Sequence, residues 1–348
     1  MKVEVYSPTI RRREMDAVLT ALVEDKIGPG EQGKLLIQIA REKLEFEYCL
    51  ALRSPATALY IALKSLGLEE GRGVIISALS PLYYLNVIED LKLTPLYADV
   101  SMNSANMNRE TIENTLNSGH DGIQAGAIIL HHSLGYLPDT VSIAALGLPL
   151  IEDRSQSYGN SGSKPSQDGN TVLTLLGLEE RDMLTAGGGA LLCAFNRRDA
   201  SVLKNYGDLP PEYGLPDMNA AMGIVQFRGA AKNLQRRQEI AAVYYQAAGK
   251  TRHKCFINES DSAEGGYNNY AFPLILETGM KDVKAYARRK EIIVENAFER
   301  TLTGLGIVPA DLCPQAFSLS LRTVLFPLYP RLRAEEIEKV ARLILTLP

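Results

Sequence analysis

Apolar residues along the chain recur at two spacings, which predict helices alternating with buried strands. Met15, Val18, Leu19, Leu22 and Val23 follow a helical period, so residues 14–26 are expected to form a helix. Short apolar runs separated by helical stretches are typical of parallel strands joined by crossovers. Further helices are predicted at 34–46 and 55–66, and strands at 74–77, 95–98, 127–130, 149–152, 172–176 and 189–195, the last with an antiparallel direction left open.

The pattern changes after residue 216. Asp217 is expected to cap a long helix that runs to about residue 248. The chain is therefore expected to comprise a large α/β domain over 1–249 and a small α+β domain over 250–348. Within the small domain, strands are predicted at 271–276 and 292–294, helices near 281–290 and 334–346, and a mobile loop at 261–270.

Composition excludes several classes of function. The chain has 348 residues, 46% hydrophobic and 22% charged, with a net charge of −4 and no evident basic stripe. Binding to nucleic acid or to an anionic membrane is therefore not expected. No apolar run is long enough for a membrane span, and the amino terminus lacks the apolar core of a signal peptide. The four cysteines are widely spaced, which fits reduced thiols of a cytoplasmic protein better than disulfides or a zinc site.

Two short motifs have ordinary interpretations. Residues 28–33, GPGEQG, match the G-x-G-x-x-G pattern, but a predicted helix precedes them where a dinucleotide site needs a strand. A plain turn is the favoured interpretation. His131 and His132 end a predicted strand, and neighbouring strand residues point to opposite faces, so the pair is not expected to bind one metal. Either could face a site at the carboxyl end of the sheet, although a hydrogen-bonded core histidine is slightly favoured.

A carboxylate at the end of the predicted strand 149–152 carries more information. Asp153 stands where a carboxylate can keep a pyridinium nitrogen protonated, which makes the ring an electron sink. The alternative is a helix cap or an ion pair, with Arg154 or Arg181 as its partner. The glycines at 187–189 allow a close backbone approach or simply a turn.

Taken in order, seven segments resemble those of the DegT/DnrJ-type sugar-nucleotide aminotransferases, a branch of the fold-type-I pyridoxal-phosphate enzymes. The resemblance covers nearly the whole chain. The segments are 27-IGPG-30 (family pattern LGPG), 53-RSPATALYIAL-63 (NSGTAALHLAL), 74-VIISALSPLYYLNVI-88 (VIVPSFTFVATANAV), 127-AIILHHSLG-135 (AIIPVHLYG), 150-LIEDRSQSYG-159 (VIEDAAQAHG), 219-NAAMGIVQF-227 (QAAIGLAQL) and 325-LFPLYPRLRAEEIEKV-340 (SLPLYPGLTDEEVDYV).

The resemblance implies a large domain with a mostly parallel, seven-stranded sheet and a small carboxyl-terminal domain. It also implies a homodimer with its sites at the subunit interface. Members of the family transfer an amino group to keto-sugar nucleotides, in polysaccharide and lipopolysaccharide biosynthesis. They use pyridoxal phosphate or pyridoxamine phosphate, and a lysine forms the Schiff base with the cofactor.

The sequence departs from the family at that lysine. The family stretch FSFYPTKNLTTGEGG matches 175-LLGLEERDMLTAGGG-189, which places Arg181 at the lysine position. No lysine occurs from Pro165 to Leu203, so a shifted alignment does not restore it. An arginine guanidinium stays protonated in proteins and does not condense with an aldehyde as a lysine amine does. Lysine-dependent transamination is therefore predicted to fail.

Other cofactor contacts implied by the resemblance are also altered, so the cofactor is expected to bind weakly or not at all. At the positions of the family's phosphate-binding Gly-Thr pair, Pro55 lacks a backbone N–H donor and Ala56 lacks a side-chain hydroxyl. The altered positions are Pro55, Ala56, Leu176, Glu212 and Gly214, and the residual cofactor-binding candidates are Asp153, Gln156, His132 and, if the helix start shifts by one residue, Thr57.

Three functions follow as hypotheses. The favoured one is an aminotransferase homologue without catalytic activity that acts as a binding or regulatory protein for a sugar nucleotide. The second is a pyridoxal- or pyridoxamine-phosphate enzyme of sugar biosynthesis with altered chemistry, in which His132 or Tyr83 carries protons. The third is a subunit that completes the site of an active paralogue. Glu212 and Gly214 disfavour it because this chain brings neither missing donor.

Overall fold

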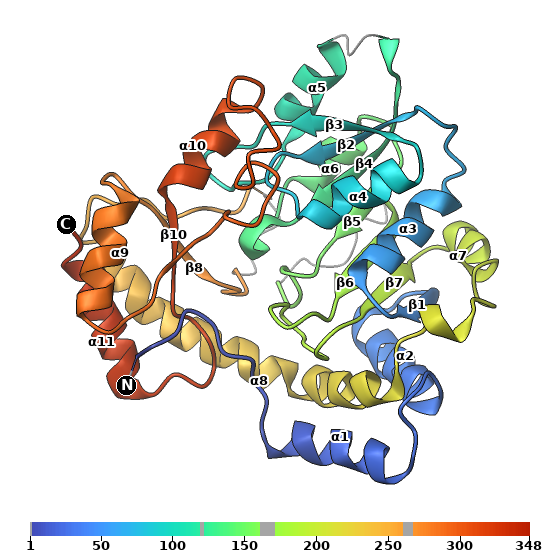
Figure 1. The fold of residues 1–348 in the computed structure, drawn as a ribbon, viewed down its shortest axis with the longest axis horizontal. Helices are drawn as coiled ribbons and strands as arrows, with labels where there is room; N and C mark the ends of the chain where they lie inside the picture. Colours follow the sequence, from blue (N-terminus) through green and yellow to red (C-terminus); the bar gives the residue numbers. More distant parts are fainter. Residues whose placement is uncertain (1, 119–121, 161–170, 260–266) are drawn as a thin grey trace.

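The larger part of the molecule is built on one sheet. The structure is a computed structural model and describes residues 2–118, 122–160, 171–259 and 267–348. Within these ranges the strands of the sheet are β1 (Tyr48–Leu52), β2 (Gly73–Ser77), β3 (Thr94–Ala98), β4 (Ala125–His131), β5 (Leu150–Asp153), β6 (Thr171–Gly177) and β7 (Ala190–Ala194). The seven strands lie in the order β1-β7-β6-β5-β4-β2-β3 (Figure 1).

Strands β2 to β6 run parallel to one another, as the alternation of strands and helices predicts. Strand β7 is antiparallel to both β6 and β1, which settles the direction left open by the sequence. Strand β1 was not predicted. The parallel register of β4 and β5 places His131 opposite Asp153, so the carboxyl ends of these strands bring the two residues together.

Helices cover both faces of the sheet. Their bounds are α1 (Arg12–Val23), α2 (Glu31–Leu44), α3 (Pro55–Ser65), α4 (Leu82–Asp90), α5 (Arg109–Asn117), α6 (Thr140–Ala144), α7 (Arg197–Lys204) and α8 (Asp217–Ala248). Helices α3 and α4 pack on the face that carries Ile129 and Ile151, and α5 and α6 pack on the opposite face with Ile128 and Leu130. Helices α2 and α8 cover the β6–β7–β1 end.

A smaller sheet forms the second part, at the left of Figure 1. The elements of this part are β8 (Phe272–Ile275), α9 (Met280–Arg289), β9 (Glu295–Asn296), α10 (Pro314–Arg322), β10 (Thr323–Phe326) and α11 (Ala334–Leu345). The sheet is antiparallel, in the order β8-β10-β9. The strand predicted at 292–294 differs from the structure, because Ile292 only forms an isolated bridge to Val3 and the strand follows it. Helix α10 and strand β10 were not predicted.

The loop predicted at 261–270 lies for the most part outside the described residues. Helix α8 connects the two parts. Its residues up to Ala230 pack with the β6–β7–β1 end of the large sheet, and its residues from Ile240 onward pack with the small sheet. Each helix within the described ranges is too short or too polar to cross a bilayer.

Asp217 has a different role from the one predicted. It is the first residue of α8, and its carboxylate accepts a hydrogen bond from the Gly33 N–H, 2.9 Å away, at the start of α2. A Cβ atom on Gly30 would lie 2.8 Å from the same carboxylate, so a side chain at this position would collide with it. Residues 28–30 of the glycine motif lie in the turn that connects α1 to α2, residues 31–33 begin α2, and a helix precedes the motif as predicted.

Candidate functional site

The carboxylate of Asp153, at the end of β5, is the centre of a buried polar cluster. One oxygen, Oδ2, accepts hydrogen bonds from the hydroxyls of Tyr83 at 3.1 Å and Tyr84 at 2.5 Å. The other oxygen, Oδ1, accepts from the N–H of Ser155 at 2.9 Å and from its hydroxyl. A carboxylate offers about four acceptor positions. All of them are therefore taken by groups of the chain itself.

These contacts keep Asp153 ionised. Burial by itself would raise the pKa of Asp153, but its contacts with His131, Ser155 and Tyr84 hold that pKa below its ordinary value. The Nδ1 atom of His131 lies 3.8 Å from Oδ2. Burial and the adjacent carboxylate raise the pKa values of both tyrosines, so their hydroxyls remain protonated donors.

His132 lies on the other side of the sheet end. Its Nε2 atom is 3.1 Å from Oε1 of Glu152, and its Nδ1 atom is 2.7 Å from the hydroxyl of Ser157. Burial lowers the pKa of His132, whereas Glu152 has a pKa of about 2 because Arg154 and His132 outweigh its burial. The structure thus brings His131 beside Asp153, whereas His132, the residual cofactor-binding candidate, contacts Glu152 and Ser157. The two histidines point in opposite directions, as their strand positions predict.

Arg181, which the resemblance aligns with the family lysine, is paired with the small sheet. Its guanidinium makes two hydrogen bonds to Glu295, at 2.7 and 3.3 Å, and stacks over the ring of Tyr6 at 5.5 Å. The hydrogen bond to Glu295 raises the pKa of Arg181 further. The sequence-based partners of Asp153 were therefore wrong, since Arg181 pairs with Glu295 and the Arg154 side chain lies 4.0 Å from Glu152.

A second carboxylate lies close to the cluster. Asp182 accepts a hydrogen bond from the Glu179 N–H at 2.8 Å, and its Oδ2 atom packs over the backbone of Gly177. A Cβ on Gly177 would overlap Oδ2 of Asp182 and lie 2.8 Å from the hydroxyl of Ser155, so a larger residue would displace these side chains. Burial, together with the charge of Asp153, raises the pKa of Asp182 to about 7.

The remaining candidates hold backbone in place. Thr57, in the first turn of α3, donates its N–H to the Ser54 hydroxyl at 3.1 Å, and the two hydroxyls lie 2.9 Å apart. This end of the helix is therefore capped by its own side chains. Gln156 accepts a hydrogen bond from the Leu134 N–H at 2.8 Å. Glu212 accepts one from Arg53 through its backbone carbonyl, at 2.7 Å.

The residues present do not fit a lysine-linked pyridoxal phosphate. A protonated ring nitrogen needs an acceptor position on Asp153, and Tyr83, Tyr84 and Ser155 fill these positions. Arg181, which the resemblance aligns with the lysine amine that would hold the aldehyde, is paired with Glu295. The Asp182 carboxylate adds a further negative charge when ionised. No chemical step is therefore assigned to the cofactor in this chain.

Four positions of the sequence around Asp153 carry a signal for this cluster. In the family segments quoted above, the positions of Tyr83, Tyr84 and Ser155 carry alanine, threonine and alanine, and that of His131 carries valine. Each of these substitutions places a polar group beside Asp153. Around the Asp153 carboxylate, larger polar residues thus stand where the family segments have smaller ones. This indicates that the side chains of the protein itself fill the space beside the carboxylate.

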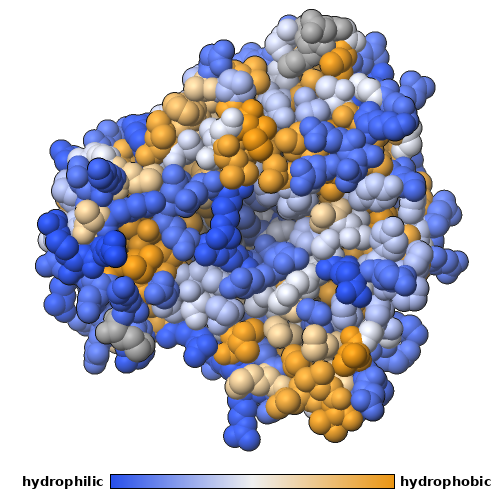
Figure 2. Space-filling view, in the orientation of Figure 1, coloured by the Kyte–Doolittle hydropathy of each residue, from blue (hydrophilic) through white to orange (hydrophobic). Residues whose placement is uncertain are grey.

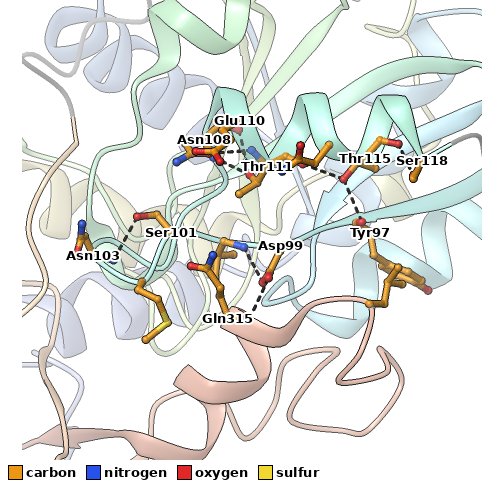
Figure 3. Close-up of a pocket in the computed structure, with 14 residues that line it drawn as sticks. Tyr97, Asp99, Ser101, Asn103, Asn108, Glu110, Thr111, Thr115, Ser118 and Gln315 are labelled. Atoms are coloured by element: carbon orange, nitrogen blue, oxygen red, sulfur yellow. Dashed lines mark hydrogen bonds between the residues drawn. The ribbon is translucent and has the colours of Figure 1, made fainter.

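A separate polar cavity of about 510 Å³ lies between α5, the segment after β3 and α10 (Figure 3). Asp99, in its wall, accepts hydrogen bonds from the N–H groups of Gln315 at 3.0 Å and Ala316 at 2.8 Å. Asp99 therefore caps α10 from a distant part of the chain. Asn108 caps α5 in the same cavity wall, through the N–H of Thr111.

Solved structures share this fold at low sequence identity. The aminotransferase TlmJ from Streptoalloteichus hindustanus has a TM-score of 0.85 and 20% identity, over 98% of this chain and 97% of that chain. The pyridoxal-phosphate form of the sugar aminotransferase Spr1654 from Streptococcus pneumoniae gives 0.86 and 17%, over 99% and 98%. A GDP-4-keto-6-deoxy-D-mannose-3-dehydratase from E. coli, with bound hydrated pyridoxal phosphate, gives 0.84 and 14%, over 99% of each chain. The molecule therefore has the α/β fold of pyridoxal-phosphate aminotransferases.

The sequence model of the DegT/DnrJ/EryC1/StrS aminotransferase family matches residues 8–172 and 193–345. The chain belongs to this family, as the seven segments predicted. The two matched ranges leave out residues 173–192, which contain Arg181 and Asp182.

Proposed function

We propose that this chain is an inactive aminotransferase homologue that binds a sugar nucleotide as a binding or regulatory protein. The observation that carries the proposal is the Asp153 carboxylate whose acceptor positions are filled, together with the Arg181–Glu295 pair, which the resemblance aligns with the lysine position. Membership in a family of sugar aminotransferases supports the class of ligand. A structural neighbour, a mutant of the dehydratase ColD solved with bound GDP-perosamine, supports it further.

Absorption spectroscopy tests the loss of cofactor chemistry. We expect the purified chain, mixed with pyridoxal phosphate, to show no band of a protein-linked aldimine and no label after borohydride reduction. Arg181→Lys restores the amine but leaves Asp153 occupied, so it is expected to remain without the band. A triple variant, Arg181→Lys with Tyr83→Ala and Tyr84→Thr, returns three of the quoted family residues. It is expected to gain the band only at high pyridoxal phosphate concentration, because Pro55 and Ala56 remain at the phosphate-binding pair. A covalent adduct on the unmodified chain would contradict the proposal.

Ligand binding is tested separately. Calorimetric titration with a nucleoside-diphosphate sugar is expected to give saturable binding that does not depend on added pyridoxal phosphate. Transaminase activity with the same sugar and an amino donor is expected to be absent. Turnover by the unmodified chain would refute the proposal, and a lack of any heat with several sugar nucleotides would refute its ligand.

The competing proposal is a pyridoxal- or pyridoxamine-phosphate enzyme of sugar biosynthesis with altered chemistry. One observation favours it, because Asp153 remains ionised at the end of β5. It requires Tyr83 and Tyr84 to leave the carboxylate. Titration with pyridoxamine phosphate distinguishes the two, since saturable binding that Asp153→Asn abolishes would support the enzyme.

We further propose that the chain forms a homodimer in the cytoplasm. The apolar stripe of α1 predicted by the helical spacing points outward, and Figure 2 shows it as an apolar patch at the bottom of the view. Leu19 is 56% exposed and Val23 is 82% exposed. The family resemblance implies a homodimer, and we propose that the second copy covers this surface. Light scattering is expected to give a dimer for the unmodified chain and a monomer for Leu19→Asp; a monomeric unmodified chain would rule this out.

A further inference from the structure

A basic groove lies between the start of α1 and the middle of α8. It encloses about 560 Å³ and shares no lining residue with the Asp153 cluster. The two helices that form its walls run side by side in Figure 1. The cationic residues of the groove are Arg11, Arg12, Arg13, Arg228 and Lys232. The tertiary structure brings residues 228 and 232 to the arginines of 11–13, which explains why no basic stripe is evident in the sequence.

The positive charge of the groove is largely uncompensated. Glu14 is the acidic residue of the lining, and it is already engaged, by the N–H of Arg11 at 2.9 Å and the amide of Gln226 at 3.0 Å. Arg12 approaches Asp16 at 3.7 Å, but both side chains are well exposed. Within the described part of the chain, the other four cations make no ion pair. Because the whole chain has a net charge of −4, this concentration of cations is local.

The chemistry of these groups selects an anion with several oxygens. Guanidinium groups donate in a planar fork that matches phosphate, and they accept no hydrogen bonds. The N-terminal end of α1, a helix of 12 residues, adds a positive partial charge to the same wall. A Cβ atom built on Gly229 meets nothing within 4 Å, so the floor of the groove is open at this residue.

We propose that this groove binds a small molecule bearing a diphosphate or similar polyphosphate group. The cations are distributed over two helices, so they surround an anion from two sides. Thr9 and Asn233 supply neutral polar groups beside them, and Val225 an apolar contact. The proposal does not rest on the function proposed for the Asp153 cluster, because the two sites have separate residues and separate tests.

Calorimetric titration of the full chain with inorganic pyrophosphate tests the proposal. Arg13→Gln and Arg228→Gln each remove one donor, and each is expected to weaken binding about ten-fold. Gly229→Leu fills the floor without changing the charge and suits a helix, so it is expected to weaken binding by a similar factor. Arg342→Gln, an exposed arginine on α11, is the matched control and is expected to bind as the unmodified chain does.

Three results would overturn the proposal. One is a lack of pyrophosphate binding by the unmodified chain at low ionic strength. Another is an equal loss of affinity in Arg342→Gln and Arg228→Gln, which would indicate non-specific attraction. The third is binding to vesicles containing anionic phospholipid without binding to pyrophosphate, which would assign the groove to a membrane surface. Thermal unfolding of each variant, compared with the unmodified chain, separates loss of binding from loss of folding.

Discussion

Replacing Tyr84 by phenylalanine tests whether the chain has rebuilt the space around Asp153. The substitution removes one hydroxyl from a fully buried side chain and leaves Oδ2 of Asp153 with Tyr83 as its donor. A hydrogen bond to a charged group contributes about 1.5–3 kcal/mol to stability. Unfolding entropy is about 2.1 cal/mol/K per residue, which over 348 residues gives roughly 0.7 kcal/mol/K. The melting temperature should therefore fall by about 2–4 °C.

The loss of stability in Tyr84→Phe is also expected to depend on pH. Asp153 has a lowered pKa in the folded state, so its contribution to stability is present above its unfolded pKa of about 4 and is lost as the pH falls. The difference between Tyr84→Phe and the unmodified chain is thus expected to shrink below about pH 4. Calorimetry over a pH series measures it, with Tyr60→Phe as the control. An unchanged melting temperature near neutral pH, or the same loss at every pH, would refute the reasoning.

Four further outcomes are expected. Glu295→Gln should cost about 1 kcal/mol of unfolding free energy, because its pair with Arg181 is partly exposed, and the loss in urea titrations should shrink at high salt. Asp182 has a raised folded pKa, so unfolding free energy should fall as the pH rises from about 4 to 7, and Asp182→Asn should abolish that fall in denaturant titrations. Asp217→Ala should cost about 1 kcal/mol in urea unfolding, as the cap on Gly33 is lost. Arg237→Met leaves three backbone carbonyls without their donor and should lower the unfolding free energy by about 3 kcal/mol or more in the same assay.

The strands of the parallel sheet could be predicted because each is a short, nearly continuous apolar run. Strand β1 was missed because it lies between two predicted helices and its pairing with β7 is a long-range contact. The piece at 292–294 has the apolar character of a strand, yet Ile292 meets Val3 from the opposite end of the chain. The local pattern of apolar residues therefore predicts strands that are buried on both faces. It does not predict strands whose position depends on pairing with a distant segment of the chain.

The candidate site could likewise be predicted only in part from the sequence. Asp153 could be placed at a strand end from sequence, and the resemblance identified Arg181 as the departure. The partner of Arg181 could not be found, because Glu295 is 114 residues away and follows no local motif. The choice between His131 and His132 depended on which face of the sheet each side chain occupies. Strand register decides this, and a shift of one residue reverses the answer.

The continuity of α8 couples the two parts of the molecule. Its 32 residues correspond to a rod of about 48 Å, with no break between the residues that pack on the large sheet and those that pack on the small one. Apolar residues of both parts pack against α8. If the packing in one part is lost, the helix loses contacts that also stabilise its packing in the other part. The two parts are therefore expected to melt as one cooperative unit, and any change in their relative orientation has to bend this helix.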